Sequence, residues 1–165
     1  MQQLTILNTK EIRQLREMLV AQFGFFPKED YAFLRNEKNR VFLINKDVAK
    51  IDWQKLIVDK VGLYFGEFPE REFGKEFRLS KEGAQLLGVW AKKAQVKLKN
   101  VITLTAEEVK EYFQGRELQK DCGIENQFVL LQYQNGILGC AKYKEGRILN
   151  FMPKIHRGEV ILNCK

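Results

Sequence analysis

The sequence NQFVLLQYQNGILGCAKYKEGRILNFMPKIHR occupies residues 126–157 and carries the clearest strand pattern in the chain. Two turn signals, Asn135-Gly136 and Glu145-Gly146, separate three runs that are rich in β-branched and aromatic residues. An Asn-Gly pair between two such runs is a strong signal for a tight β-hairpin turn. The pattern therefore predicts an antiparallel meander of three strands.

The predicted meander and the residues after it are basic. From Gly139 to Lys165 the sequence holds six Lys or Arg against two acids. The whole chain of 165 residues has 28 Lys or Arg against 21 Asp or Glu, and a formal net charge of +7. This balance favours a polyanionic partner such as nucleic acid. Because many basic proteins bind no nucleic acid, charge alone leaves the partner open.

The composition is that of a folded protein without a membrane segment. Hydrophobic residues make up 45% and charged residues 30% of the chain, as is typical of globular domains. No run reaches the roughly 20 apolar residues of a membrane-spanning helix, and the N-terminus lacks a signal-peptide layout. We therefore expect a cytoplasmic protein. Its cysteines, Cys122, Cys140 and Cys164, are odd in number and lack metal-binding spacing, so reduced thiols are expected.

The first 94 residues predict one α+β unit. A helix is expected after Thr9 as its N-cap, and Gly24 is expected to end it. Residues 31–36 and 40–45 flank a short polar turn and predict a β-hairpin. The remaining expected elements of this unit are a strand around residues 61–65, a short strand at 77–80 and a helix over 81–94, which Ser80 is expected to cap.

The residues from 95 onward predict a second unit. Apolar and basic residues alternate after Gln95, so residues 95–104 are expected to form a strand. Thr105 and Glu108 fit the capping box of a short helix, which Gly115 is expected to close. The basic meander completes this unit. We therefore predict two domains, residues 1–94 and 95–165, that pack directly against each other.

Three stretches resemble known families. Residues 61–100, with the pattern Gly-x-x-Phe-Gly-x-Phe before Phe-Arg-Leu, resemble the middle of small ribosome-biogenesis factors of the Nip-seven type, and so does the early hairpin. The pattern beyond Val101 is similar to a PUA domain, an RNA-binding fold. The tail LGCAKYKEGRILNFMPK resembles the C-terminal RNA-binding region of Nop/Sun-type RNA cytosine-5 methyltransferases, with Gly146, Arg147, Asn150 and Pro153 at the matching positions.

The resemblance implies an α+β protein, in which an N-terminal α/β pre-PUA domain with an antiparallel sheet and flanking helices precedes a PUA-like β-barrel. It also implies an RNA-binding protein, with ribosomal RNA favoured and transfer RNA possible. We expect a monomer, because no long apolar surface stripe is obvious in the sequence. Those methyltransferases carry a glycine-rich loop for S-adenosylmethionine and catalytic Pro-Cys segments, and this chain has neither. We therefore expect no catalytic residue, cofactor or metal. The alternative is an adaptor that recruits a separate RNA methyltransferase or a ribosome-assembly factor.

The candidate RNA-binding residues are polar or basic side chains of the second unit. Lys and Arg side chains gain sequence-independent affinity by contacting phosphates, and Arg147 has the strongest individual claim because it follows a predicted turn. Each single lysine is equally well explained as part of a solvated basic face. The candidates are Arg116, Lys120, Lys142, Lys144, Arg147, Asn150, Lys154 and Arg157.

Three further expectations concern single side chains. If Lys142 and Lys144 both face solvent on their strand, Tyr143 between them faces the core. Phe68 and Phe73 lie in or beside a charged loop and are weak candidates for docking a protein partner. His156, the only histidine in the sequence, lacks a recognisable catalytic partner and is interpreted as part of the basic tail.

Overall fold

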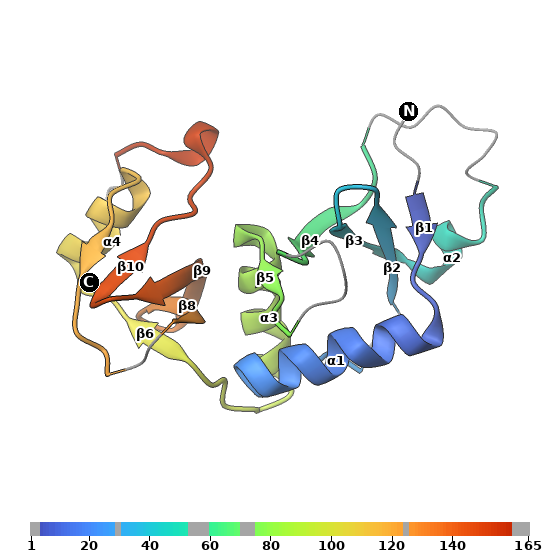
Figure 1. Cartoon of the computed structure of the whole chain (residues 1–165), viewed down its shortest axis with the longest axis horizontal. Helices are drawn as coiled ribbons and strands as arrows, with labels where there is room; N and C mark the ends of the chain where they lie inside the picture. Colours follow the sequence, from blue (N-terminus) through green and yellow to red (C-terminus); the bar gives the residue numbers. More distant parts are fainter. Residues whose placement is uncertain (1–3, 29–30, 53–59, 70–74, 124–125, 160–165) are drawn as a thin grey trace.

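Two five-stranded sheets follow each other along the chain (Figure 1). They are seen in a computed structural model that describes residues 4–28, 31–52, 60–69, 75–123 and 126–159. Figure 1 shows the first sheet with α1 and α2 in one half of the molecule and the second sheet with α4 in the other. No helix in these ranges is long and apolar enough to cross a membrane.

The first sheet has the order β1-β2-β3-β4-β5, and every neighbouring pair is antiparallel. The predicted hairpin is confirmed as β2 and β3. Asn36 stabilises its turn, because the side-chain oxygen accepts hydrogen bonds from the backbone N–H groups of Lys38 and Arg40, each at 3.0 Å. The strands are β1 (Leu4–Ile6), β2 (Tyr31–Asn36), β3 (Arg40–Asn45), β4 (Leu63–Glu67) and β5 (Arg78–Leu79).

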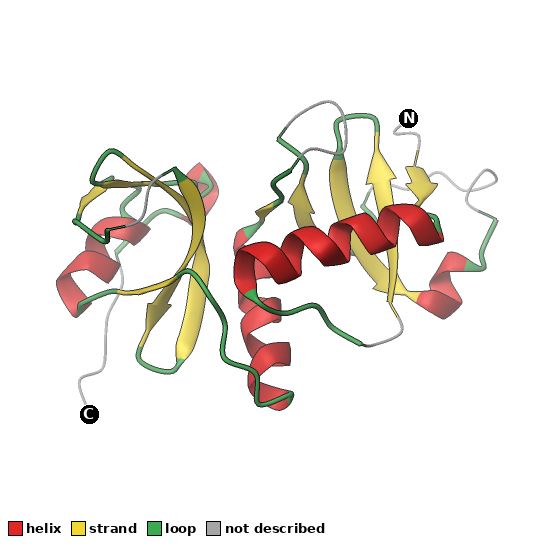
Figure 2. Cartoon of the chain, turned by 60° about the horizontal axis from the view of Figure 1, so that its bottom comes forward, coloured by secondary structure: helices red, strands yellow, loops and turns green. Residues whose placement is uncertain are grey.

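Helix α1 (Thr9–Phe23) covers one face of the first sheet (Figure 2). Its N-cap is Asn8 rather than the predicted Thr9, because the Asn8 side-chain oxygen accepts a hydrogen bond from the Glu11 backbone N–H and the Glu11 carboxylate accepts one from the Asn8 backbone N–H. Gly24 ends the helix with a left-handed φ of 81°, as predicted. The short helix α2 (Lys46–Ala49) follows β3 directly.

Helix α3 (Lys81–Lys93) connects the two sheets. Ser80 caps it as predicted, and its hydroxyl accepts a hydrogen bond from the backbone N–H of Gly83 at 2.8 Å. On the other side, the Gln85 side chain donates to the Leu138 carbonyl at 3.0 Å, in the second sheet. The largest core cluster contains Phe65 and Trp90 together with Leu130 and other residues of the second sheet. The two sheets therefore share one apolar core through α3.

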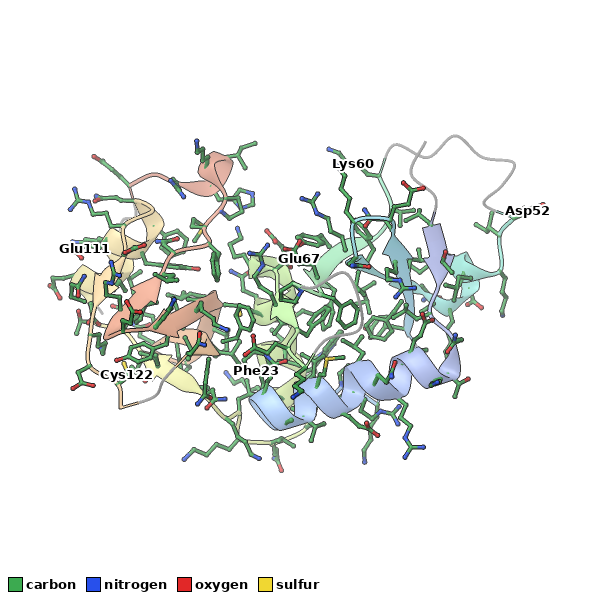
Figure 3. The ribbon with its side chains drawn as sticks, viewed as in Figure 1. Phe23, Asp52, Lys60, Glu67, Glu111 and Cys122 are labelled. Carbon is green, nitrogen blue, oxygen red and sulfur yellow. The ribbon has the colours of Figure 1, made fainter. Side chains whose placement is uncertain are left out.

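The predicted strand over residues 95–104 is wrong in its first part, since only β6 (Val101–Thr103) forms. Gln95 and Asn100 have left-handed φ values of 55° and 53°, which break an extended conformation. Tertiary hydrogen bonds hold the linking segment instead. The Lys99 N–H donates to the Phe23 carbonyl at 2.8 Å, and Phe23 lies at the end of α1 that is nearest to α3 (Figure 3).

The second sheet has the order β6-β8-β9-β10-β7 and curls into a half-barrel (Figure 2). The antiparallel meander is confirmed as β8 (Gln127–Tyr133), β9 (Gly136–Lys144) and β10 (Arg147–Leu149). β6 pairs with β8 in parallel, and β7 (Leu118–Gln119) pairs with β10. Helix α4 (Ala106–Phe113) begins at the predicted capping box and buries Val109 and Tyr112. Tyr143 faces the core, as expected from the alternation around it.

Candidate nucleic-acid interface

The predicted RNA-binding residues lie in different places on the second half of the molecule. Several of their side chains are engaged in contacts within the protein, and others are exposed. The structure therefore divides the candidates into structural residues, a basic edge, and a lysine at the junction of the two sheets.

Lys120 is half-buried, and three hydrogen bonds fix its ammonium group. Its ammonium group donates to both carboxylate oxygens of Glu108, at 3.0 and 2.9 Å, and to the Thr103 carbonyl at 3.1 Å. These contacts join the segment after α4 to the start of that helix and to β6. They satisfy the three donors of an ammonium group, so the structure assigns Lys120 a structural role.

The contacts of Glu108 predict a pH-dependent contribution to stability. Partial burial raises the pKa of this carboxyl, but hydrogen bonds from Lys120 and Thr105 outweigh burial and leave the pKa below its usual value. Because the pKa of Glu108 is lower in the folded state, its ionised carboxylate stabilises the fold at pH values above the unfolded pKa of about 4.3. This contribution to stability is lost as the pH falls through the pKa of the folded state. Glu108→Gln is therefore expected to destabilise the protein at pH 7 by more than at pH 3.

Urea denaturation at the two pH values measures this difference. Glu107→Gln is the matched control, because Glu107 is exposed in the same helical turn and makes none of the Glu108 contacts. A Glu108→Gln effect of equal size at both pH values would contradict the prediction.

Asn150 and Arg157 anchor the C-terminal segment to the end of α4. The Asn150 amide donates to the carbonyls of Tyr112 and Arg116, at 2.7 and 2.8 Å, and its oxygen accepts from the Met152 N–H at 2.7 Å. Arg157 donates to the Met152 carbonyl at 3.1 Å. Because its amide is used on both sides, Asn150 clamps the backbone, and its contact with RNA stays a prediction.

Gly115 makes room for this anchoring. It has a left-handed φ of 83°, and a side chain there would collide with the guanidinium of Arg157. The group that comes closest to Gly115 is thus the Arg157 guanidinium of the same chain. Arg157 remains exposed beyond its single backbone contact.

The remaining cations lie at the turn between β9 and β10, just after α4, and in the segment that follows β10. Arg147 is 42% exposed and pairs with Glu117 at 3.4 Å and Glu145 at 3.8 Å, distances typical of weak surface pairs. In the part of the chain that the structure describes, the side chains of Arg116 and Lys154 have no hydrogen bond or ion pair. We call this set the basic edge: Arg116, Lys144, Arg147, Lys154 and Arg157.

Lys142 lies at the junction of the two sheets instead. Its ammonium group pairs with Glu76 at 2.9 Å and lies 4.3 Å from the centre of the Phe128 ring. The Lys142 side chain is only 16% exposed. It is therefore in part a contact between the two halves of the chain.

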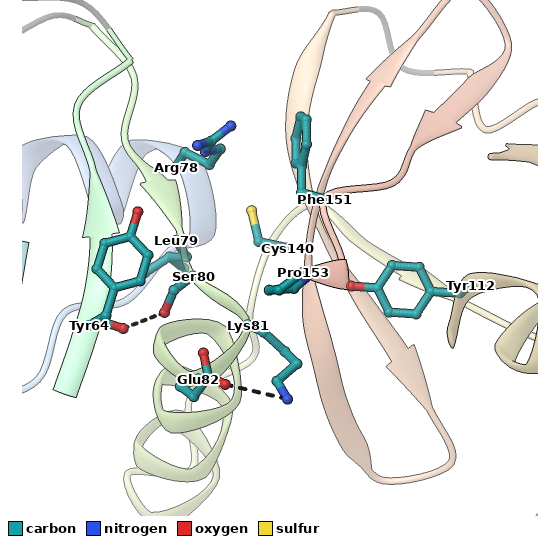
Figure 4. A pocket seen from close by; sticks show the side chains of 10 residues that line it. All are labelled: Tyr64, Arg78, Leu79, Ser80, Lys81, Glu82, Tyr112, Cys140, Phe151 and Pro153. Atoms are coloured by element: carbon teal, nitrogen blue, oxygen red, sulfur yellow. Dashed lines mark hydrogen bonds and ion pairs between the residues drawn. The ribbon is translucent and has the colours of Figure 1, made fainter. Parts of the chain in front are cut away.

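An inter-sheet cavity of about 180 Å³ lies beside this junction (Figure 4). One wall comes from β4, β5 and the start of α3, and the other from α4, β9 and the segment after β10. The 3-10 turn η2 (Lys154–His156) adjoins it, since His156 lies 3.8 Å from Glu82. The lining residues are Tyr64, Arg78, Leu79, Ser80, Lys81, Glu82, Tyr112, Cys140, Phe151 and Pro153.

The charged groups of the cavity are arranged in short ion pairs. Arg78 contacts Glu67, and Lys81 lies 3.3 Å from Glu82. The Tyr64 hydroxyl donates to Glu67 at 2.7 Å, and burial followed by this hydrogen bond raises the pKa of Tyr64. Burial likewise raises the pKa of Tyr112, so both phenols stay protonated at neutral pH and are able to donate hydrogen bonds.

Of the two aromatics predicted to dock a partner, only Phe68 lies within the described residues. Phe68 is 3% exposed and packs against Phe77 with ring centres 5.0 Å apart, so it belongs to the core. This corrects the expectation that Phe68 docks a partner. Phe73 and Cys164 lie outside the described residues.

Sequence reasoning missed the cavity residues. From the sequence, Phe151 could be placed only within the basic tail, and Arg78 only within a short strand. Their relevance depends on the packing of one half of the chain against the other, for which no local pattern gives a signal.

Two comparisons with known proteins agree with this geometry. Residues 90–157 match the family model described as "Methyltransferase RsmF PUA domain". The matched segment begins within α3 and contains the whole second sheet together with the basic edge. The second half of the chain is thus similar to a PUA domain, and its sheet curls into a half-barrel.

The chain is also similar to the ribosomal RNA small subunit methyltransferase F of Aeromonas hydrophila subsp. hydrophila. The two sequences are 27% identical over 148 residues, which is 90% of this chain but 28% of that protein. The chain therefore spans less than a third of the curated relative that it matches. Both comparisons support the predicted resemblance to RNA methyltransferases, while the Nip-seven resemblance stays a prediction.

Proposed function

We propose that this chain is an RNA-binding module that acts on ribosomal RNA, in its modification or in ribosome biogenesis. The observation that carries the proposal is the match of residues 90–157 to the PUA domain of an RNA methyltransferase family. The basic edge supports it, because two of its cations have no partner within the described residues and Arg147 is held only by weak surface pairs. Such side chains are available to phosphates.

We further propose that the chain has no catalytic activity of its own. A cysteine nucleophile must be a thiolate, and burial raises the pKa of the Cys140 thiol to about 12. Burial also raises the pKa of Cys122, which lies on the side of the second sheet away from the first (Figure 3). Neither described cysteine therefore has the environment of a reactive thiol.

Charge reversal on the basic edge tests the RNA-binding proposal. The double variant Arg147→Glu, Lys154→Glu is expected to weaken binding to a mixed-sequence single-stranded RNA and to flatten its salt dependence. Each lost phosphate contact lowers the slope of log affinity against log salt by about 0.7 to 1. Fluorescence anisotropy over a salt titration gives the slope.

The matched control is Lys10→Glu, Lys38→Glu, which changes the charge by the same amount on exposed positions of the first half. It is expected to leave the slope nearly unchanged. If the two double variants reduced the slope equally, binding would depend on net charge alone and the basic edge would not be the interface.

A further inference from the structure

Tyr112 places a hydroxyl without a partner in the inter-sheet cavity. The residue is 1% exposed, and its hydroxyl makes no hydrogen bond within the described residues. Figure 4 shows this hydroxyl pointing away from α4 toward Pro153 and the other lining residues. Buried polar groups have a hydrogen-bond partner in about nine cases out of ten. A buried donor that faces a cavity therefore indicates a polar group that arrives with a ligand.

Gly139 keeps the space around this hydroxyl open. A Cβ atom at Gly139 would lie only 2.5 Å from the Tyr112 hydroxyl oxygen. Any side chain on this position of β9 would push the phenol out of its present place. Because Gly139 has no side chain, the Tyr112 hydroxyl on α4 can reach the cavity and donate a hydrogen bond there.

The mouth of the cavity presents a flat aromatic surface next to cations. Phe151 is 38% exposed, and the Arg78 guanidinium lies over its ring at 5.0 Å from the centre. The Phe128 ring lies 6.4 Å from Phe151, and Lys142 covers Phe128. Splayed-out RNA bases stack on aromatic rings and on guanidinium planes, while neighbouring cations hold their phosphates.

The size of the cavity limits what enters it. At about 180 Å³, it is smaller than the roughly 300 Å³ at which pockets for drug-sized ligands begin. A volume of this size suits one planar ring system rather than a whole dinucleotide. On the polar wall, Lys81 carries donors and Glu82 carries acceptors that could face the edge of such a ring.

We propose that the inter-sheet cavity accepts a single unstacked base of the bound RNA, which the Tyr112 hydroxyl recognises by a hydrogen bond and Phe151 holds by stacking. Arg78 and Lys81 lie beside the mouth, where the phosphates flanking that base pass. The inference rests on the proposed RNA-binding function and adds a base-reading site to it. That site lies at the junction of the two sheets, next to Lys154 of the basic edge, which directly follows the lining residue Pro153.

Binding to two polymers of equal length tests the inference: a mixed-sequence single-stranded RNA, and a ribose-phosphate polymer without bases. Wild-type protein is expected to bind the RNA more tightly than the abasic polymer. Tyr112→Phe is expected to weaken RNA binding about 3- to 10-fold, the loss of one hydrogen bond. Phe151→Ala is expected to weaken it about 5- to 100-fold through lost stacking. Neither variant is expected to change binding of the abasic polymer.

The variants are designed to remain folded. Because the Tyr112 hydroxyl has no partner, Tyr112→Phe is expected to leave the melting temperature unchanged or raised. Tyr133→Phe, which removes a phenolic hydroxyl elsewhere in the second sheet, is the matched control and is expected to bind RNA as the wild type does.

Each of three outcomes would contradict either the proposed RNA-binding function or the proposed base site. If wild-type protein bound neither polymer, the proposed RNA-binding function itself would fail. Equal binding of both polymers, with Tyr112→Phe and Phe151→Ala unchanged, would remove the base site while RNA binding stands. If free nucleoside monophosphates competed with the RNA at equal concentration, the cavity would be a site for mononucleotides rather than for a base within RNA.

Discussion

Phe65→Ala is expected to lower the free energy of unfolding by about 3–5 kcal/mol, the range for removing a fully buried ring. Phe65 is 0% exposed, and its ring lies 5.7 Å from that of Phe33, 5.9 Å from Phe77 and 6.2 Å from Trp90. It belongs to the core cluster that continues into the second sheet. The cavity left by the ring would therefore weaken the packing that holds both halves together.

Guanidinium denaturation monitored by tryptophan fluorescence measures this loss. Val89→Ala is the control, because Val89 is 51% exposed on α3 and surface substitutions change stability by about 0.5 kcal/mol or less. A Phe65→Ala effect below about 1 kcal/mol, the size of a typical point substitution, would show that the shared core contributes little to stability.

Gly83→Ala is expected to destabilise the protein by about 1–3 kcal/mol, the usual cost of an overpacked contact. Two effects oppose each other at this position. Alanine favours a helix over glycine by about 1 kcal/mol, but a Cβ at Gly83 would collide with the Phe65 carbonyl oxygen. That oxygen accepts a hydrogen bond from the Ser80 N–H at 3.0 Å. The backbone of β4 has little freedom to move, so the collision is expected to outweigh the helix propensity.

Gly136→Ala provides the matched glycine substitution, since a Cβ there meets only the Tyr133 carbonyl oxygen, at 3.9 Å. It is expected to change stability by less than about 1 kcal/mol. If Gly83→Ala stabilised the protein instead, α3 would not pack on β4 as closely as the structure shows.

The elements that could be predicted from sequence are those whose signals are local. The turn after Tyr133 and the caps at Ser80 and Thr105 depend on residues within four positions of each other, and all three are confirmed. The strand prediction is wrong for residues 95–100, because long-range hydrogen bonds outweigh the alternating local pattern there. Asn100 donates to the Gln22 carbonyl at 2.6 Å, across 78 positions, and this contact has no signature in the alternation.

In the candidate site, too, the local features could be predicted from the sequence and the long-range contacts could not. The cluster of cations after Gly115 is visible in the sequence, but which cations are already paired is not. Lys120 finds Glu108 across 12 positions, and Lys142 finds Glu76 across 66. The inter-sheet cavity combines Arg78, Tyr112 and Phe151 from three separate parts of the chain. Only the packing of both sheets against α3 brings these side chains together.

Crosslinking of the protein to RNA in cells that produce it, followed by sequencing of the RNA and mapping of the crosslinked peptides, tests RNA binding most directly. The expected result is enrichment of ribosomal RNA, with crosslinks in peptides covering residues 116–157. The Arg147→Glu, Lys154→Glu variant is expected to recover less of this RNA. Recovery of no RNA above background, or crosslinks confined to the first sheet, would contradict the assignment of the second half as the RNA-binding part.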